Sequence, residues 1–334
     1  MQASLILSLL ILLAAAVAIY LACGFFVNGV EWVGRKLAVG QQATASILAA
    51  VGTALPESII TFIAVVFGAT PEQKSLGVGA AMGGPLVLST IAYAVVGATL
   101  FWSHQKLPRT PTIQQEFRRL SRDQAWFLVV FAAKVILGVV VFVWKPWLGI
   151  LFLAVYAVFF WYQMRGESQH EEGELEPLKL APKRSEPLAW QAYLQTLAAL
   201  VVIFGASQVF VNQLDVLGPQ LGLPPQLLAL LLSPIATELP ETMNAVIWVR
   251  QGKHRLALAN ISGSMMIQAT VPTALGLFFT PWLFDRSLLV AAGATFAAIA
   301  LMFAFFRRGI GSRALLASMA LFYLAFALIA LVWF

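Results

Sequence analysis

This chain contains repeated apolar stretches of roughly 20 residues or more. A helix of that length can cross a hydrocarbon core about 30 Å thick. Every backbone polar group in such a core must be satisfied internally, which favours helices. The composition agrees, because 60% of the residues are hydrophobic and 11% are charged, whereas soluble proteins carry about 25% charged residues. The sequence therefore predicts an all-α polytopic membrane protein.

Hydropathy predicts ten transmembrane helices, and a single polar stretch divides them into two groups of five. The first apolar run has no Lys or Arg ahead of it, unlike a signal peptide, so it is predicted to be a retained span. The polar stretch is a linker at 166–188, between predicted domains 1–165 and 189–334. The expected spans are 3–28, 37–69, 74–102, 123–144, 146–165, 189–214, 225–251, 254–280, 287–306 and 313–333.

Basic residues predict the orientation of these spans. With the N-terminus outside, most of the 21 Lys and Arg residues fall in inner loops, as the positive-inside rule requires. Both termini are then outside and the linker is cytoplasmic. The net charge of +6 arises from these basic residues of the inner loops. It is explained by the topology, so no nucleic acid partner is expected. The expected partners are the lipid bilayer and small inorganic cations, with no obligate protein partner, and the small size favours a bacterial inner membrane.

Two related motifs indicate that the halves form an inverted repeat. Five spans per half is an odd number, so the second half enters the membrane from the opposite side. GTALPESIITFIAV, which begins at residue 52, aligns with ATELPETMNAVIWV, which begins at residue 236. Further along, LGVGAAMGGPLVLSTI at 76–91 aligns with LALANISGSMMIQATV at 256–271.

Each LPE motif combines a helix breaker with a carboxylate inside an apolar run. Pro56 removes a helical hydrogen bond and frees a carbonyl, Glu57 adds a carboxylate, and Thr53 lies one turn earlier on the same face. The second motif repeats this arrangement with Thr237, Pro240 and Glu241. Carboxylates within a membrane mark ion pathways, and oxygen ligands suit hard cations such as Ca²⁺ and Na⁺. We therefore expect two broken helices to enclose one ion site.

These motifs resemble the GTSLPE signature of the sodium/calcium exchanger family, and NISGSMMIQ is similar to the family's GN-x-x-GSN-x-x-D segment. The resemblance implies that Glu57 and Glu241 line a central calcium site. It also implies that Thr53, Thr237 and Ser264 bind sodium, together with backbone carbonyls near Ala50 and Pro234.

The chain departs from the family pattern at several ligand positions. Ala54, Gly84 and Leu88 remove side-chain oxygens from the first half, although Ser89 lies nearby, whereas Glu238 adds a third carboxylate to the second half. Gln268 stands where the family has Asn or Asp. Glu57, Glu238 and Glu241 are the predicted metal ligands. Because like charges oppose one another's ionisation, this site could couple to H⁺ as readily as to Na⁺.

Lys134 is a further candidate, about midway along the fourth expected span. An uncompensated Lys is costly there, so it should face the bundle and pair with an acid. A structural ion pair, a direct role in coupling and a misplaced span boundary are all open at this stage.

The sequence thus predicts a secondary active antiporter that exchanges sodium for calcium by alternating access, without a cofactor. A proton-coupled cation exchanger is the alternative in mechanism. A membrane-embedded enzyme with Glu238 and Glu241 as acid and base is a rival of another class, but no nucleophile–base pair, HExxH motif or phosphate loop supports it. A non-transporting relative is a third possibility, because several ligands have been lost.

Overall fold

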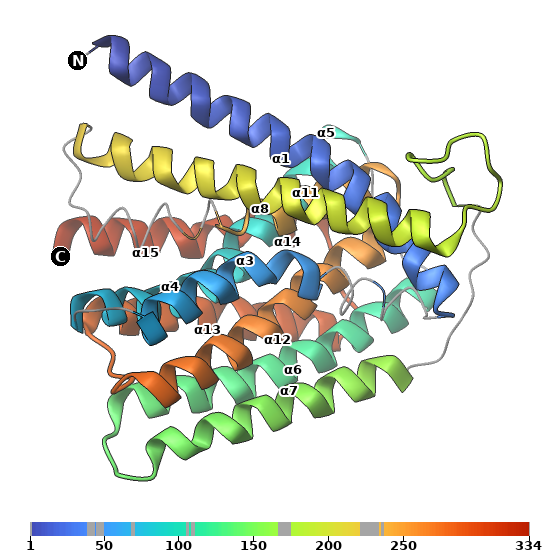
Figure 1. Ribbon diagram of the computed structural model, residues 1–334. Helices are drawn as coiled ribbons and strands as arrows, with labels where there is room; N and C mark the ends of the chain where they lie inside the picture. Colours follow the sequence, from blue (N-terminus) through green and yellow to red (C-terminus); the bar gives the residue numbers. More distant parts are fainter. Residues whose placement is uncertain are drawn as a thin grey trace.

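A computed structural model describes residues 2–38, 44, 50–67, 71–104, 107, 111–165, 175–220, 234 and 237–333. Every regular element in these ranges is helical, and none is a strand. The long helices run roughly along one direction, and the two termini lie at the same end of the bundle (Figure 1). This confirms the expected all-helical fold class.

The helices follow the chain in this order. The first half contains α1 (Gln2–Lys36), α3 (Ala50–Phe62), α4 (Pro71–Val87), α5 (Tyr93–Trp102), α6 (Pro111–Val139) and α7 (Leu148–Arg165). The second half contains α8 (Ala189–Gln220), α11 (Leu239–Arg250), α12 (His254–Phe279), α13 (Arg286–Arg307), α14 (Arg313–Ser318) and α15 (Ala320–Trp333). Two π-helical segments, η2 (Ile63–Phe67) and η3 (Leu88–Ala92), continue α3 and α4, and a 3₁₀ turn, η4 (Lys145–Trp147), precedes α7.

Seven helices within the described ranges are long and apolar enough to cross a membrane: Ile6–Lys36, Gly77–Trp102, Lys145–Met164, Ala189–Ala206, His254–Phe279, Arg286–Arg307 and Arg313–Val332. They coincide with seven of the ten expected spans. The expected span 123–144 lies wholly within the described residues and is not among these seven. The expected spans 37–69 and 225–251 fall partly on residues outside the description, so the count of ten stays a prediction.

Helix α6 differs from the expected span 123–144, since it begins at Pro111 and ends at Val139. Proline is well suited to a first helical turn, where its missing N–H costs nothing. The extra N-terminal turns are amphipathic and stack Phe117 on Phe306, with ring centroids 5.0 Å apart. At the other end, Lys145 turns back and donates to the Val140 carbonyl oxygen at 2.7 Å, which stabilises the non-helical exit. Hydropathy alone detects neither feature.

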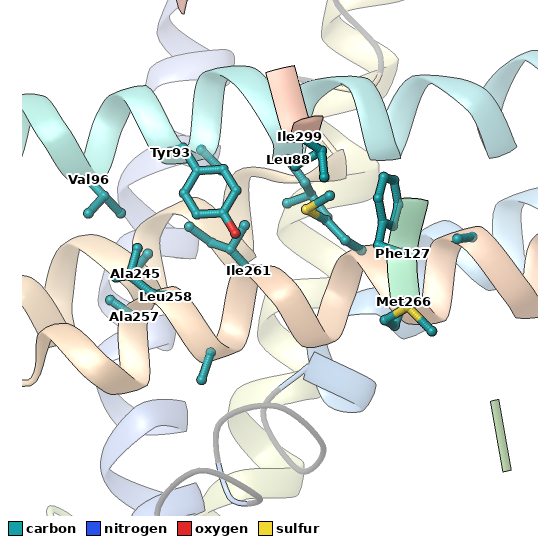
Figure 2. Packing of buried hydrophobic residues seen from close by; sticks show 14 of the residues in the cluster. Leu88, Tyr93, Val96, Phe127, Ala245, Ala257, Leu258, Ile261, Met266 and Ile299 are labelled. Carbon is teal, nitrogen blue, oxygen red and sulfur yellow. The ribbon is translucent and has the colours of Figure 1, made fainter. Parts of the chain in front are cut away.

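Helix α12 is the centre of the molecule, and α1 lies at its edge. The most apolar stretch of α12 is 83% buried, compared with 28% for α1. Helix α12 contacts α3, α4, α6, α7 and α11. Figure 2 shows Tyr93 of α5 pointing toward Ile261 of α12 within the hydrophobic core. The most buried of the seven described spans therefore carries the NISGSMMIQ segment of the second half.

The described end of the linker packs against the paired helices α1 and α8, which lie side by side (Figure 1). We call residues 175–181 the linker strap. The Trp32 indole N–H donates to the Glu176 carbonyl oxygen at 2.9 Å, and the Lys179 backbone N–H donates to the Asn28 side-chain oxygen at 3.0 Å. Leu178 is fully buried. This part of the linker is thus ordered against the bundle.

Candidate functional site

The second LPE motif lies at the start of a helix. Glu238 occupies a turn, and α11 begins at Leu239, with Pro240 in its first positions. A proline costs little there, because that N–H would have no helical partner. The Glu238 backbone N–H donates to the Pro234 carbonyl oxygen at 3.0 Å, and the Thr237 hydroxyl donates to the same oxygen at 3.2 Å. These bonds fix the turn that places Glu238 and Glu241 in the protein interior, where both are fully buried.

The first LPE motif is built differently. Helix α3 runs through Pro56 without interruption and changes to π geometry only at Ile63. The expected break at this motif is therefore wrong in the described structure, because one lost hydrogen bond does not by itself end a helix. Glu57 is 3% exposed, and its carboxyl interacts with the Thr237 hydroxyl. Thr53 lies in α3, but its side chain is outside the described part of the chain.

The two motifs therefore meet across the interface between the halves. Besides Thr237, the charges of Glu238 and Glu57 interact with each other, and Glu238 also interacts with Glu241. Glu238 thus lies within electrostatic range of the other two carboxylates predicted from the sequence. Within the described residues, however, no three His, Cys, Asp or Glu side chains converge as a ready-made metal centre, so their joint role as ligands stays a prediction.

Gln268 of α12 links this carboxylate cluster to the helices of the first half. Its amide Nε2 donates to Glu238 Oε1 at 2.5 Å. A side chain at Gly84 would collide with Gln268, because an added Cβ would lie 2.5 Å from Gln268 Oε1. The loss of a side chain at Gly84 and the longer side chain at Gln268 are therefore spatially complementary.

Several buried polar atoms on α12 and on the turn before α11 have no hydrogen-bond partner among the described residues. They include Glu238 Oε2, Gln268 Oε1 and the Ser264 hydroxyl, all on fully buried side chains. Leaving such a group unpaired costs about 1–3 kcal/mol. A cation or water bound there would satisfy these oxygens.

Lys134 of α6 reaches the same region. Its ammonium donates to the Ala81 carbonyl oxygen of α4 at 2.6 Å and to the Gln268 carbonyl oxygen of α12 at 3.3 Å. It also interacts electrostatically with Glu57. The side chain is fully buried, so it faces the interior of the bundle. Lys134 also lies inside helix α6, so a wrong span boundary does not explain its position.

The other candidate residues have more local contacts. Ser89 donates to the Leu86 carbonyl oxygen of its own helix at 3.0 Å. Ala50 and Ala54 pack against Ile267 of α12 in a small apolar cluster. Small residues at such positions let helices approach closely. The hydroxyl missing at Ala54 is thus replaced by an apolar helix contact.

Sequence reasoning missed the two prolines that shape the Lys134 contact. Pro85 lies inside α4 and Pro272 inside α12. A helical proline leaves the carbonyl four residues earlier without its N–H partner, and those carbonyls belong to Ala81 and Gln268. A search for the residue four positions before every intramembrane proline would have found both.

The fold and the site define an all-helical membrane protein with charged side chains buried among its central helices. The model of the sodium/calcium exchanger protein family matches residues 7–165 and 191–334. The chain belongs to this family, which confirms the resemblance seen in the LPE motifs.

Individual relatives are similar to the chain in sequence, and solved structures share its fold. The chain is 24% identical over 267 residues to CaxA of Alkalimonas amylolytica, named as a candidate antiporter, with 78% of this chain and 77% of CaxA covered. It is 25% identical over 236 residues to the inner membrane protein YrbG of Escherichia coli K12, with 69% and 67% covered. A structure of the sodium-calcium exchanger NCX_Mj has the same fold, with a TM-score of 0.72, 17% identity and 99% of each chain covered.

Proposed function

We propose that the protein is a secondary active cation antiporter that exchanges sodium for calcium by alternating access. The observation that carries this proposal is the burial of Glu57, Glu238 and Glu241, which come from two halves of the chain, in the interior of a membrane protein, with Glu238 in electrostatic range of the other two. Buried carboxylates are costly in a membrane and mark ion pathways. Membership of the sodium/calcium exchanger family supports the same conclusion.

In this proposal the chain has ten spans in two inverted five-helix repeats, 1–165 and 189–334, joined by a cytoplasmic linker. The cavity opens to one side at a time, and the exchanged cations compete for the same oxygens. Thr53, Thr237, Ser264 and Gln268 contribute to the ion site, and so do carbonyl groups near Ala50 and Pro234. Both termini lie outside a bacterial inner membrane, and the protein is a transporter without enzymatic activity or cofactor.

Calcium uptake into proteoliposomes tests the proposal. Sodium-loaded vesicles are diluted into sodium-free buffer with labelled calcium, and uptake is expected only with the sodium gradient. Glu241→Gln should reduce the rate at least about tenfold, because contacts to a charged group are worth about 1.5–3 kcal/mol. Glu116→Gln is the matched control. Glu116 forms an ion pair with Arg255 at 2.9 Å, is partly exposed and does not belong to the carboxylate cluster. Uptake that ignores the sodium gradient contradicts sodium coupling.

Proton coupling is the second candidate, because Glu238 adds a carboxylate to the cluster. Its signature is calcium movement driven by a pH jump at constant sodium. If a pH jump drives uptake and a sodium gradient does not, the coupling ion is H⁺. If neither gradient moves calcium in the wild-type protein, the calcium assignment is wrong.

A further inference from the structure

An apolar groove of about 440 Å³ follows the line where α6 packs against α13. Phe131 and Ala292 line it and are buried, whereas Ile136, Leu289 and Phe296 line it and are exposed. The groove therefore opens on the outer surface of the bundle, which faces lipid in a membrane protein. Its volume lies within the range of about 300–1,000 Å³ that is typical of small-molecule sites. Every residue that lines it is apolar, so it suits a hydrocarbon ligand.

Gly293 leaves the space at the middle of this groove. A Cβ added there would meet nothing within 4 Å. Leu289 and Ala297 lie one turn to either side of Gly293 on the same face of α13, and both line the groove. From Leu289 to Ala297 the groove is about 12 Å long, at a rise of about 1.5 Å per residue. This is close to half of a hydrocarbon core about 30 Å thick, which matches a ligand that occupies one leaflet.

An exposed arginine stands at one end of the groove. Arg286 is the first residue of α13 and lies one turn before Leu289 on the same face. Its side chain is exposed, and among the described residues it takes part in no ion pair. The acidic neighbour Asp285 caps α13, because its Oδ1 accepts from the Leu288 backbone N–H at 2.9 Å. The guanidinium is thus a positive charge at the mouth of an apolar groove.

This end of the groove lies near the end of two spans. The Phe284 backbone N–H donates to the Gly138 carbonyl oxygen at 2.8 Å, which fixes the chain before α13 to the last turn of α6. Helix α6 ends and α13 begins at the end of the bundle where both termini lie (Figure 1). Arg286 is therefore placed where lipid headgroups meet the hydrocarbon core, and its planar guanidinium matches the geometry of a phosphate.

We propose that this groove is a binding site for an anionic phospholipid, with one acyl chain against Gly293 and the phosphate at Arg286. A second copy of the chain is a less suitable occupant. A two-fold dimer through this face would bring the Arg286 side chains of both copies to the same end of the interface, where like charges repel. The site does not depend on the proposed antiport.

Native mass spectrometry of the full chain in detergent tests the site, with phosphatidylglycerol and phosphatidylcholine as probes. The wild-type protein should bind one phosphatidylglycerol about tenfold more tightly than phosphatidylcholine, because hydrogen bonds to a charged group are strong. Arg286→Gln should abolish this preference. Gly293→Leu fills the groove without a clash and should weaken binding of both lipids at least about tenfold, while leucine favours the helix more than glycine does.

Two matched variants serve as controls. An added Cβ at Gly205 of α8 also meets nothing within 4 Å, so Gly205→Leu adds the same side chain to another span. Arg308→Gln removes an exposed arginine at the opposite end of α13. Both should bind phosphatidylglycerol as the wild-type protein does. A wild-type protein without a preference for phosphatidylglycerol overturns the proposal, and so does Gly293→Leu that binds both lipids as before.

Crosslinking locates the lipid on the wild-type protein. Phosphatidylglycerol with a photoreactive diazirine on one acyl chain should label peptides of α6 and α13, and unlabelled phosphatidylglycerol should compete. Labelling that is spread over all spans, or that phosphatidylcholine competes equally well, contradicts a specific site. If wild type is a dimer and Gly293→Leu makes it a monomer without loss of lipid, the groove is a contact between copies and the proposal is wrong.

Discussion

At the scale of single residues, the cluster combines losses and gains that fit one another in space. Gly84 lacks the side chain that the family pattern has there, and the longer Gln268 occupies the adjacent volume and holds Glu238. The sequence revealed both departures separately. It could not reveal that they are neighbours, because this depends on how α4 and α12 pack.

Gly84→Ser is therefore expected to destabilise the protein. Its Cβ would lie 2.5 Å from Gln268 Oε1 and 2.8 Å from Gln268 Cδ, and overpacking of this kind costs about 1–3 kcal/mol. Shortening the neighbour in the double variant Gly84→Ser with Gln268→Asn should recover most of the loss. Thermal unfolding in detergent measures both effects.

Gly79→Ser is the control for this substitution, because it lies on the same helix and an added Cβ there meets nothing within 4 Å. It should leave the melting temperature nearly unchanged. If Gly84→Ser and Gly79→Ser behave alike, or if the double variant does not recover, the two departures are not coupled.

At the scale of elements, hydropathy predicted seven helices that are long and apolar enough to cross a membrane, but not how the helices end. The expected span 313–333 divides into α14 and α15 at Met319, and the expected span 74–102 contains the π segment η3. Both irregularities lie inside apolar runs, so the pattern contains no sign of them. The contact of Lys134 with two helices was likewise unpredictable, because it requires the register of α6 against both.

The linker strap gives a prediction at this scale. Asn28 donates to the carbonyl oxygens of Glu176 and Pro177 and accepts from the Lys179 backbone N–H. Asn28→Ala removes these bonds, each worth about 1 kcal/mol, so the strap should open more often. Trypsin should then cleave after Lys179 about tenfold faster, as measured by mass spectrometry of the released peptides.

The control for the strap is Tyr193→Ala, which changes an exposed side chain on α8. Its cleavage rate should match that of wild type. Cleavage of Asn28→Ala at the wild-type rate would mean that Leu178 and the Trp32 bond hold the strap without Asn28.

At the scale of the whole molecule, the topology can be tested with thiol chemistry. Cys23 is the one cysteine of the chain and is buried, so the natural protein should react little with maleimides. Gln2→Cys and Trp333→Cys lie at the same end of the bundle and should both react with a membrane-impermeant maleimide in intact spheroplasts. Ser185→Cys in the linker should react only after permeabilisation. Labelling of the linker from outside would reverse the predicted orientation.

The Lys134 contact also has a consequence for the order of assembly during synthesis. A lysine within a membrane-spanning segment adds up to about 2.5–3.5 kcal/mol to the cost of membrane insertion. One of its carbonyl partners, Ala81, precedes α6 in the chain, but the other, Gln268, belongs to α12 and is translated much later. Helix α6 must therefore wait for the second half before its charge is fully accommodated. We expect the first half expressed alone to insert incompletely and to be degraded, and co-expression of the second half to rescue it.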